Sequence, residues 1–264
     1  MAQRLRGMLV SAKAVGARNY EAGRVNIEFR KELEMEQNPI RRDSARVAYG
    51  APVQESVLAT NKVLRNTYML LSMTLLFSAA TAGLSMALNL PYFGPLMTLG
   101  VYFGLLFLTS KMRNSAGGIV CVFALTGFMG LTLGPLLSAY LANVPNGGEL
   151  VMTALGATGL IFLGLSAYAL KSQKDFSFMG GFLMVGMIGL LAVILLGLFV
   201  DLSAFQMAIS AGVVLLMAAL ILYETSAIIH GGETNYIMAT VSLYVAIYNL
   251  FINLLMLLGL SGDD

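Results

Sequence analysis

Seven apolar stretches follow one another from Thr67 to the end of the chain, and each is long enough to cross a lipid bilayer. Short polar segments separate them, and charged residues make up only 11% of the sequence, against about 25% in soluble domains. The sequence therefore predicts an all-α integral membrane protein with seven transmembrane helices. We expect these helices at residues 67–90, 92–110, 117–142, 150–170, 178–200, 204–226 and 236–260.

The chain before the first stretch is polar and holds 12 of the 16 Lys and Arg residues. It contains no apolar run of membrane length, so we expect residues 1–57 to form a disordered cytoplasmic tail and residues 58–264 to form the membrane domain. A second interpretation concerns the start of the chain. In a bacterial gene, Lys31-Glu32 can be encoded by a ribosome-binding sequence just before Met35, in which case residues 1–34 are not native.

Basic residues beside the apolar stretches all fall on one side of the membrane if all seven stretches cross it. These residues are Lys62, Arg65, Lys111, Arg113, Lys171 and Lys174. The opposite side carries Glu149, Asp201, Asp263 and Asp264 and neither Lys nor Arg. Because basic loops remain on the cytoplasmic side of a membrane, we expect a cytoplasmic N-terminus and a periplasmic C-terminus.

Small residues within the apolar stretches indicate close helix packing. Gly130 and Gly134 form one such pair, and residues 156 and 159 and residues 186 and 189 form two more glycine pairs. These faces can serve packing within one chain, which we favour, or a dimer contact. Pro135 follows Gly134 and is expected to kink its helix, because proline lacks an N–H and clashes with the preceding turn.

Glu224 is the ionisable residue that lies most clearly inside an apolar stretch, and such residues are candidates for function. His230 and Glu233 follow in the turn, and the last stretch supplies Tyr244, Tyr248, Asn249 and Asn253. One hypothesis is a polar, pH-sensing cluster between the last two helices. The other is an ordinary carboxylate that reaches water or bonds a neighbouring helix.

Motifs for catalysis are missing from the sequence. It contains neither a Gly-x-Ser-x-Gly nucleophile motif nor a His-Glu-x-x-His zinc motif, and one His with one Cys does not make a usual zinc site. We therefore expect a non-enzymatic protein without a cofactor or a nucleic-acid partner. The basic tail is suited to anionic lipid headgroups, although its acidic residues weaken that attraction.

The region around the last turn resembles the C-terminal signature of the Bax inhibitor-1 family, and most closely that of its YccA-like bacterial branch. The matching runs are TSAIIHGGETNY at residues 225–236 and ATVSLYVAIYNLF at residues 239–251. Shorter segments agree, namely NKVLRNTY at 61–68, LGP at 133–135 and KDFSF at 174–178. The resemblance covers residues 58–264.

This resemblance implies a fold in which the last helix is surrounded by the other six, and a place in the inner membrane. It also implies association with the membrane ATP-dependent protease FtsH, as a modulator and itself a substrate, with the HflK–HflC complex as a neighbour. The cytoplasmic tail would give the protease a segment to seize.

Other members of the family leak calcium through two aspartates, one on each of the last two helices. The resemblance places Glu224 at the first position and Ala246 at the second, so the pair is incomplete in this chain. A lone carboxylate is a poor calcium site, because calcium takes six to eight oxygen ligands. A pH-sensitive calcium or proton leak that uses Glu224 therefore remains the alternative to protease modulation.

Overall fold

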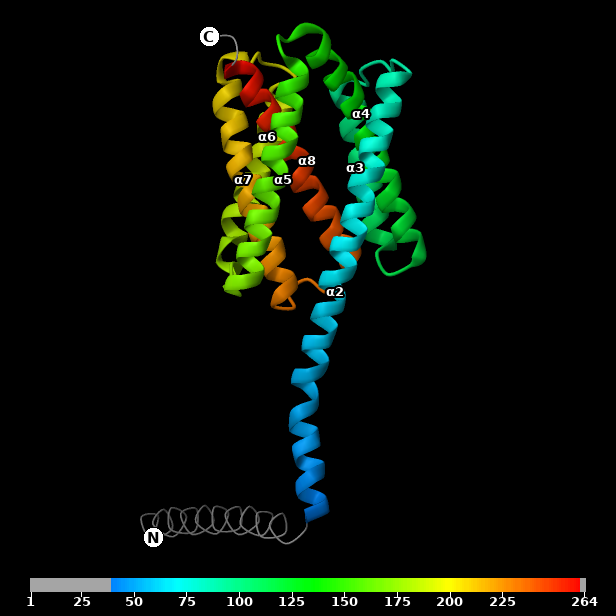
Figure 1. The fold of residues 1–264 in the computed structure, drawn as a ribbon, viewed down its shortest axis with the longest axis vertical. Helices are drawn as coiled ribbons and strands as arrows, with labels where there is room; N and C mark the ends of the chain where they lie inside the picture. The colour runs from blue at the N-terminus through cyan, green and yellow to red at the C-terminus, as the bar shows by residue number, and fades with distance from the viewer. Residues whose placement is uncertain (1–38, 262–264) are drawn as a thin grey trace, which may run out of the picture. The chain divides into compact units, whose positions relative to one another are not determined.

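The computed structural model describes residues 39–261, with side chains described from Lys62 to Leu260. Within this range every regular element is helical (Figure 1). The elements are α2 (Pro39–Ala87), α3 (Pro95–Met112), α4 (Ala116–Asn143), α5 (Gly147–Ser172), η1 (Ser177–Met179), α6 (Gly180–Leu196), η2 (Ser203–Phe205), α7 (Gln206–Ile229) and α8 (Tyr236–Ser261).

Seven of these segments are long and apolar enough to cross a membrane, so the predicted all-α fold with seven transmembrane helices is confirmed. The first of them is the part of α2 from Lys62 to Ala87, and the last is Tyr236–Leu260. Predicted and observed ends differ by a few residues. The fourth helix, for example, begins at Gly147 rather than residue 150, because Asn146 adopts the left-handed conformation that ends the preceding turn.

The chain divides into two units, Met1–Val57 and Leu58–Asp264, and the second unit contains all seven spans. The backbone of residues 39–57, assigned to the polar tail on sequence grounds, is helical and belongs to α2. Residues 1–38 lie outside the described residues. Disorder in that part of the tail, and a native start at Met35, therefore stay predictions.

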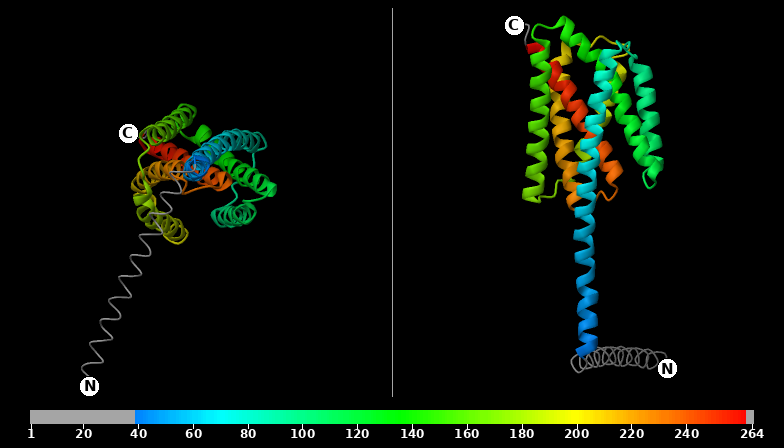
Figure 2. Two further views of the ribbon diagram at one scale, coloured as in Figure 1. Left: turned by 90° about the horizontal axis from the view of Figure 1, so that it is seen from below. Right: turned by 45° about the vertical axis from the view of Figure 1, so that its right-hand side comes forward.

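Helix α8 is the most buried of the seven spans. It packs most extensively against α7 and then α5, and it also contacts α4. Two hydrogen bonds join it to α2, and the views of Figure 2 show it crossing the middle of the bundle. Leu243, Ala246 and Leu250 are fully buried along it. In contrast, α3 and α6 are the least buried spans, and both border a cavity beside α8.

Helices α2 and α4 approach each other closely at glycine. A Cβ atom at Gly130 would overlap the Ser78 carbonyl oxygen and the Thr81 hydroxyl, and one at Gly134 would overlap the Ser85 side chain. The first glycine pair therefore serves packing within the chain. Around residues 156, 159 and 189 a Cβ would meet nothing within 4 Å, and at residue 186 it would meet a leucine side chain. The close faces predicted for those glycines are thus largely wrong within this chain.

Two Asp-x-Ser caps begin the short 3-10 helices η1 and η2, which lead into α6 and α7 at opposite ends of the bundle. The Asp175 carboxylate accepts a hydrogen bond from the Ser177 backbone N–H at 2.8 Å, and Asp201 accepts one from the Ser203 backbone N–H at 2.9 Å. The serine N–H and hydroxyl in each cap hold the pKa of the aspartate below its usual value. Each cap supplies partners for N–H groups that have none within their own helix.

We expect these caps to make folding stability sensitive to acid. Each folded aspartate has a lowered pKa, so its contribution is present above the unfolded carboxyl value, near pH 4, and is lost as pH falls through the folded pKa. The double variant Asp175→Asn, Asp201→Asn should flatten the drop in unfolding temperature below about pH 4. Thermal unfolding in detergent at several pH values measures this. Glu149→Gln, outside both caps, is the control and should keep the wild-type pH profile.

Candidate functional site

The turn between α7 and α8 gathers several polar residues at the basic end of the bundle, defined as the end that carries Lys62, Lys111 and Lys171. The side-chain oxygen of Asn235 accepts hydrogen bonds from the backbone N–H groups of Ile237 and Met238, so Asn235 caps α8. Its amide nitrogen donates to the α3–α4 loop at Arg113 and Asn114. Glu233 accepts a bond from the Asn235 backbone N–H. The turn is therefore held in one conformation.

Glu224 lies in α7 near this turn, and its side chain is half-buried. Its carboxyl group interacts with the Ser242 hydroxyl on α8 and lies near enough to Glu233 for an electrostatic effect. Ser242 and Ala246 are four residues apart and share one face of α8. Ala246 is fully buried, and it is the position at which the resemblance seen in the sequence implies the second carboxylate of the family.

His230 ends α7 and joins it to the α5–α6 loop. Its Nδ1 lies 2.9 Å from the Ser226 carbonyl oxygen, and its Nε2 lies 3.1 Å from the Gln173 carbonyl oxygen. The Ser226 hydroxyl completes the connection by donating to the Lys174 carbonyl and accepting from the Phe176 N–H. Histidine and serine together tie the loop to α7.

Tyr244 and Tyr248 lie in the middle of α8 and stack with ring centroids 6.1 Å apart. The Tyr244 hydroxyl donates to the Thr126 carbonyl of α4 at 3.2 Å and lies 2.6 Å from the Ser78 hydroxyl of α2. The Tyr248 hydroxyl lies 3.1 Å from the Thr132 hydroxyl of α4. Tyr244 therefore connects α8 to α2 and α4, and Tyr248 connects it to α4.

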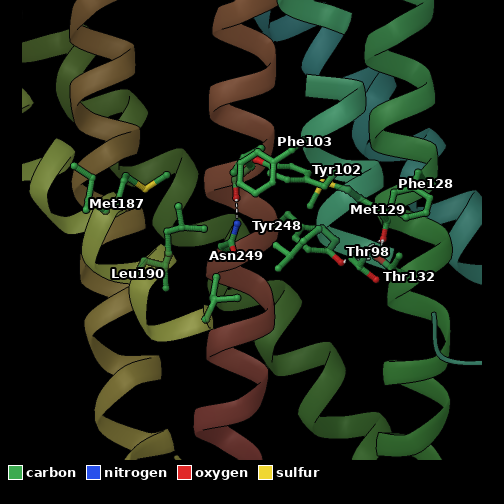
Figure 3. Close-up of a pocket in the computed structure, with 15 residues that line it drawn as sticks. Thr98, Tyr102, Phe103, Phe128, Met129, Thr132, Met187, Leu190, Tyr248 and Asn249 are labelled. Atoms are coloured by element: carbon green, nitrogen blue, oxygen red, sulfur yellow. Dashed lines mark hydrogen bonds between the residues drawn. The ribbon is translucent and has the colours of Figure 1, made fainter. Parts of the chain in front are cut away.

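Asn249 lies beside a cavity of about 400 Å³, which Tyr248 also lines (Figure 3). Its amide nitrogen donates to the Val245 carbonyl within the helix. Figure 3 shows Asn249 between Leu190 of α6 and Tyr248. Asn253, one turn further along, donates in the same way to the Asn249 carbonyl. These carboxamides are the polar part of a mostly apolar wall.

The structure thus divides the six candidate residues into two groups. Glu224, His230 and Glu233 lie at the basic end, and the two tyrosines and Asn249 lie at mid-helix. Sequence reasoning missed the partners Ser78, Thr126, Thr132, Ser226 and Ser242. One signal was available for α2, because Thr67, Thr74, Ser78 and Ser85 are spaced by 7, 4 and 7 residues and all are buried. Small polar residues at helical spacing in a membrane span indicate a packed face.

Tyr244→Phe is expected to destabilise the folded protein by about 1 kcal/mol, because the Ser78 hydroxyl is left buried without its partner. Unfolding in detergent measures the difference. Tyr68→Phe is the matched control, since the Tyr68 hydroxyl makes only a long 3.4 Å contact with Thr225. Equal losses in the two variants would show that the Tyr244–Ser78 bond has no special weight.

A bundle of seven apolar helices, in which α8 is the most buried, defines a multi-pass membrane protein. The chain belongs to the family described as inhibitor of apoptosis-promoting Bax1, which matches residues 60–263, in agreement with the resemblance seen in the sequence. It is 56% identical over 202 residues to an uncharacterized protein of Pseudomonas aeruginosa, covering 76% of this chain and 90% of that protein.

A second relative carries a functional name. The chain is 49% identical over 219 residues to the modulator of FtsH protease YccA of Escherichia coli, covering 83% of this chain and 99% of that protein. The same match in another Escherichia coli strain is named inner membrane protein YccA. An uncharacterized membrane protein of Vibrio cholerae is 46% identical over 211 residues, covering 80% of this chain and 94% of that protein. The YccA-like assignment is therefore confirmed.

Proposed function

We propose that this chain is an inner-membrane protein that binds the ATP-dependent protease FtsH and inhibits it. The observation that carries this proposal is the 49% sequence identity of the chain to a protein named as a modulator of FtsH, over nearly the whole length of that protein. The family match at residues 60–263 includes all seven spans. The HflK–HflC complex is the neighbour we expect beside the protease, and membrane lipids surround the bundle.

The orientation that we propose follows from charge. The described Lys and Arg residues that flank the spans lie at the basic end, so this end faces the cytoplasm with the N-terminal tail, and the C-terminus faces the periplasm. A cytoplasmic tail lies on the side of the membrane where ATP is available to an ATP-dependent protease. We propose that the polar residues 1–57 serve as the segment by which FtsH engages this chain.

Deleting residues 1–57 should slow degradation of this protein by FtsH in cells. The half-life after synthesis is blocked gives the answer, with a strain that lacks the protease activity as the control. A scrambled tail of the same composition tests whether length and polarity are sufficient. Equal half-lives for the full chain and the deletion would show that FtsH engages another part of the molecule.

Binding itself is tested by purifying the tagged protein from native membranes and probing for FtsH and for HflK–HflC. We expect FtsH to co-purify. An unrelated multi-pass protein with the same tag, produced at the same level, is the control. Recovery of FtsH that does not exceed this control would remove direct binding from the proposal.

A leak for calcium or protons is the second candidate, and the position of Glu224 inside α7 beside Ser242 favours it. The buried methyl group of Ala246 counts against calcium, because it leaves one carboxylate where the family pattern has two. We therefore expect liposomes that contain the protein to take up calcium no faster than empty liposomes between pH 6 and pH 8, a range of about two units around neutrality. Faster uptake that Glu224→Gln abolishes would establish the leak.

A further inference from the structure

Two cavities join along α6 and α8 at the end of the bundle opposite the basic end. The first, of about 400 Å³, is bounded by α3, α4, α6 and α8. The second, of about 520 Å³, continues along α6 and α8 to the α6–α7 loop. Leu190, Ile194 and Asn249 line both cavities, so the two adjoin along α6 and α8. We call this space the lateral groove.

The lateral groove has the length of one leaflet of a bilayer. Its inner end lies at Met187 of α6 and Val245 of α8. Its outer end lies at Asp201 and Met256. The chain rises about 16 Å along α8 from Val245 to Met256, close to the roughly 15 Å of hydrocarbon in one leaflet. The groove therefore runs from the membrane centre to the headgroup level.

The chemistry and the volume of the groove favour an apolar, narrow ligand. They consist mainly of aliphatic and aromatic side chains from α3 and α6, the two least buried spans. Water does not fill an apolar space at membrane depth. A transmembrane helix about 10 Å across needs roughly 1,300 Å³ over the length of the groove, more than the two cavities of about 400 and 520 Å³ provide together. A single hydrocarbon chain fits both the shape and the chemistry.

The mouth of the groove selects a headgroup. The exposed carboxylate of Asp201 lies there with the side chains of Ser203 and Gln206. Among the residues that the structure describes, every Lys and Arg beside a span lies at the other end of the bundle. A headgroup with an ammonium group is attracted to this mouth, whereas a purely anionic headgroup finds no cationic partner.

We propose that the lateral groove binds one acyl chain of a zwitterionic aminophospholipid, with the ammonium group of its headgroup beside Asp201. The polar rim then meets the headgroup, and the carboxamides of Asn249 and Asn253 lie along the chain. The bound lipid covers the side of α8 that the other helices leave to the groove. This assignment is independent of any action on a protease.

The test measures lipid retention with a pair of neighbouring substitutions on α6. Ile194 lines both cavities, whereas Leu195 lines neither and is similarly exposed. The protein is reconstituted with palmitoyl-oleoyl phosphatidylethanolamine, extracted in mild detergent and analysed by native mass spectrometry. Wild type and Leu195→Trp should retain one lipid per chain, and Ile194→Trp should retain roughly tenfold less, because an indole fills the groove.

Three results would overturn the proposal. These are no retained lipid in wild type, equal retention in the two tryptophan variants, and a co-purified protein rather than a lipid displaced by Ile194→Trp. Equal unfolding temperatures show that both variants are folded, and Met187→Trp at the inner end replaces Ile194→Trp if that variant unfolds. Asp201→Asn, which keeps an oxygen for the cap, should abolish the preference for phosphatidylethanolamine over phosphatidylglycerol. An unchanged preference would remove Asp201 from the site.

Discussion

Gly130→Leu is expected to destabilise the folded bundle by about 3 kcal/mol or more, which lowers the unfolding temperature by roughly 10 °C. The physical reason is the close approach of α2 to α4. Any side chain at Gly130 overlaps the Ser78 carbonyl oxygen, which is backbone and cannot rotate away. The helices must then separate, and the Tyr244–Ser78 bond is lost with them. Thermal and denaturant unfolding in detergent measure the effect.

The matched control for this prediction is Gly156→Leu on α5. Gly156 is also a glycine inside a membrane span, but a Cβ atom there meets nothing within 4 Å. We expect a change of less than about 0.5 kcal/mol, as for an exposed substitution without special contacts. Similar losses at both positions would mean that α2 and α4 do not pack through Gly130.

Ala246→Asp is expected to cost about 3 kcal/mol or more in the free energy of unfolding, because it buries a carboxyl group at a fully buried position. The same change places a carboxylate one turn from Ser242, beside the helix that carries Glu224, at the position where the family resemblance implies the second aspartate. Asparagine at position 246 has nearly the same volume as aspartate but carries no charge. Unfolding measurements on the two variants therefore separate the cost of size from the cost of charge.

Calcium uptake by liposomes tests whether Ala246→Asp also changes function. If one missing carboxylate is the reason that the chain does not conduct, Ala246→Asp should take up calcium faster than wild type, and Ala246→Asn should not. Equal rates in the three proteins, with the variants shown to be folded, would mean that the carboxylate pair alone does not make a leak in this bundle.

The sequence was sufficient to predict the seven spans, because length and hydropathy decide whether a segment crosses a bilayer. It did not reveal which face of each helix is buried. In lipid, both the packed face and the exposed face are apolar, so the contrast that marks a buried face in a soluble helix is weak. The glycines at residues 130 and 156 look alike in sequence, yet only the first meets another helix.

The candidate site was predicted in part for a related reason. Glu224 and Glu233 could be placed together because Glu224 lies near the end of α7 and Glu233 lies in the turn that follows it. The partners of Tyr244 and Tyr248 could not, because the direction of a side chain across the bundle depends on the rotation of α8 against α2 and α4. The lateral groove likewise depends on the spacing of α3 and α6, which are far apart in the chain.

The most direct measurement of the central claim is the degradation rate of a membrane substrate by purified FtsH in proteoliposomes, with and without this protein at matched amounts. Modulation by inhibition predicts slower degradation in proportion to the amount added, and no slowing by an unrelated seven-helix protein. Degradation of a soluble substrate distinguishes a block of membrane extraction from a block of the protease itself. An unchanged rate for both substrates, together with no binding to FtsH, would contradict the account.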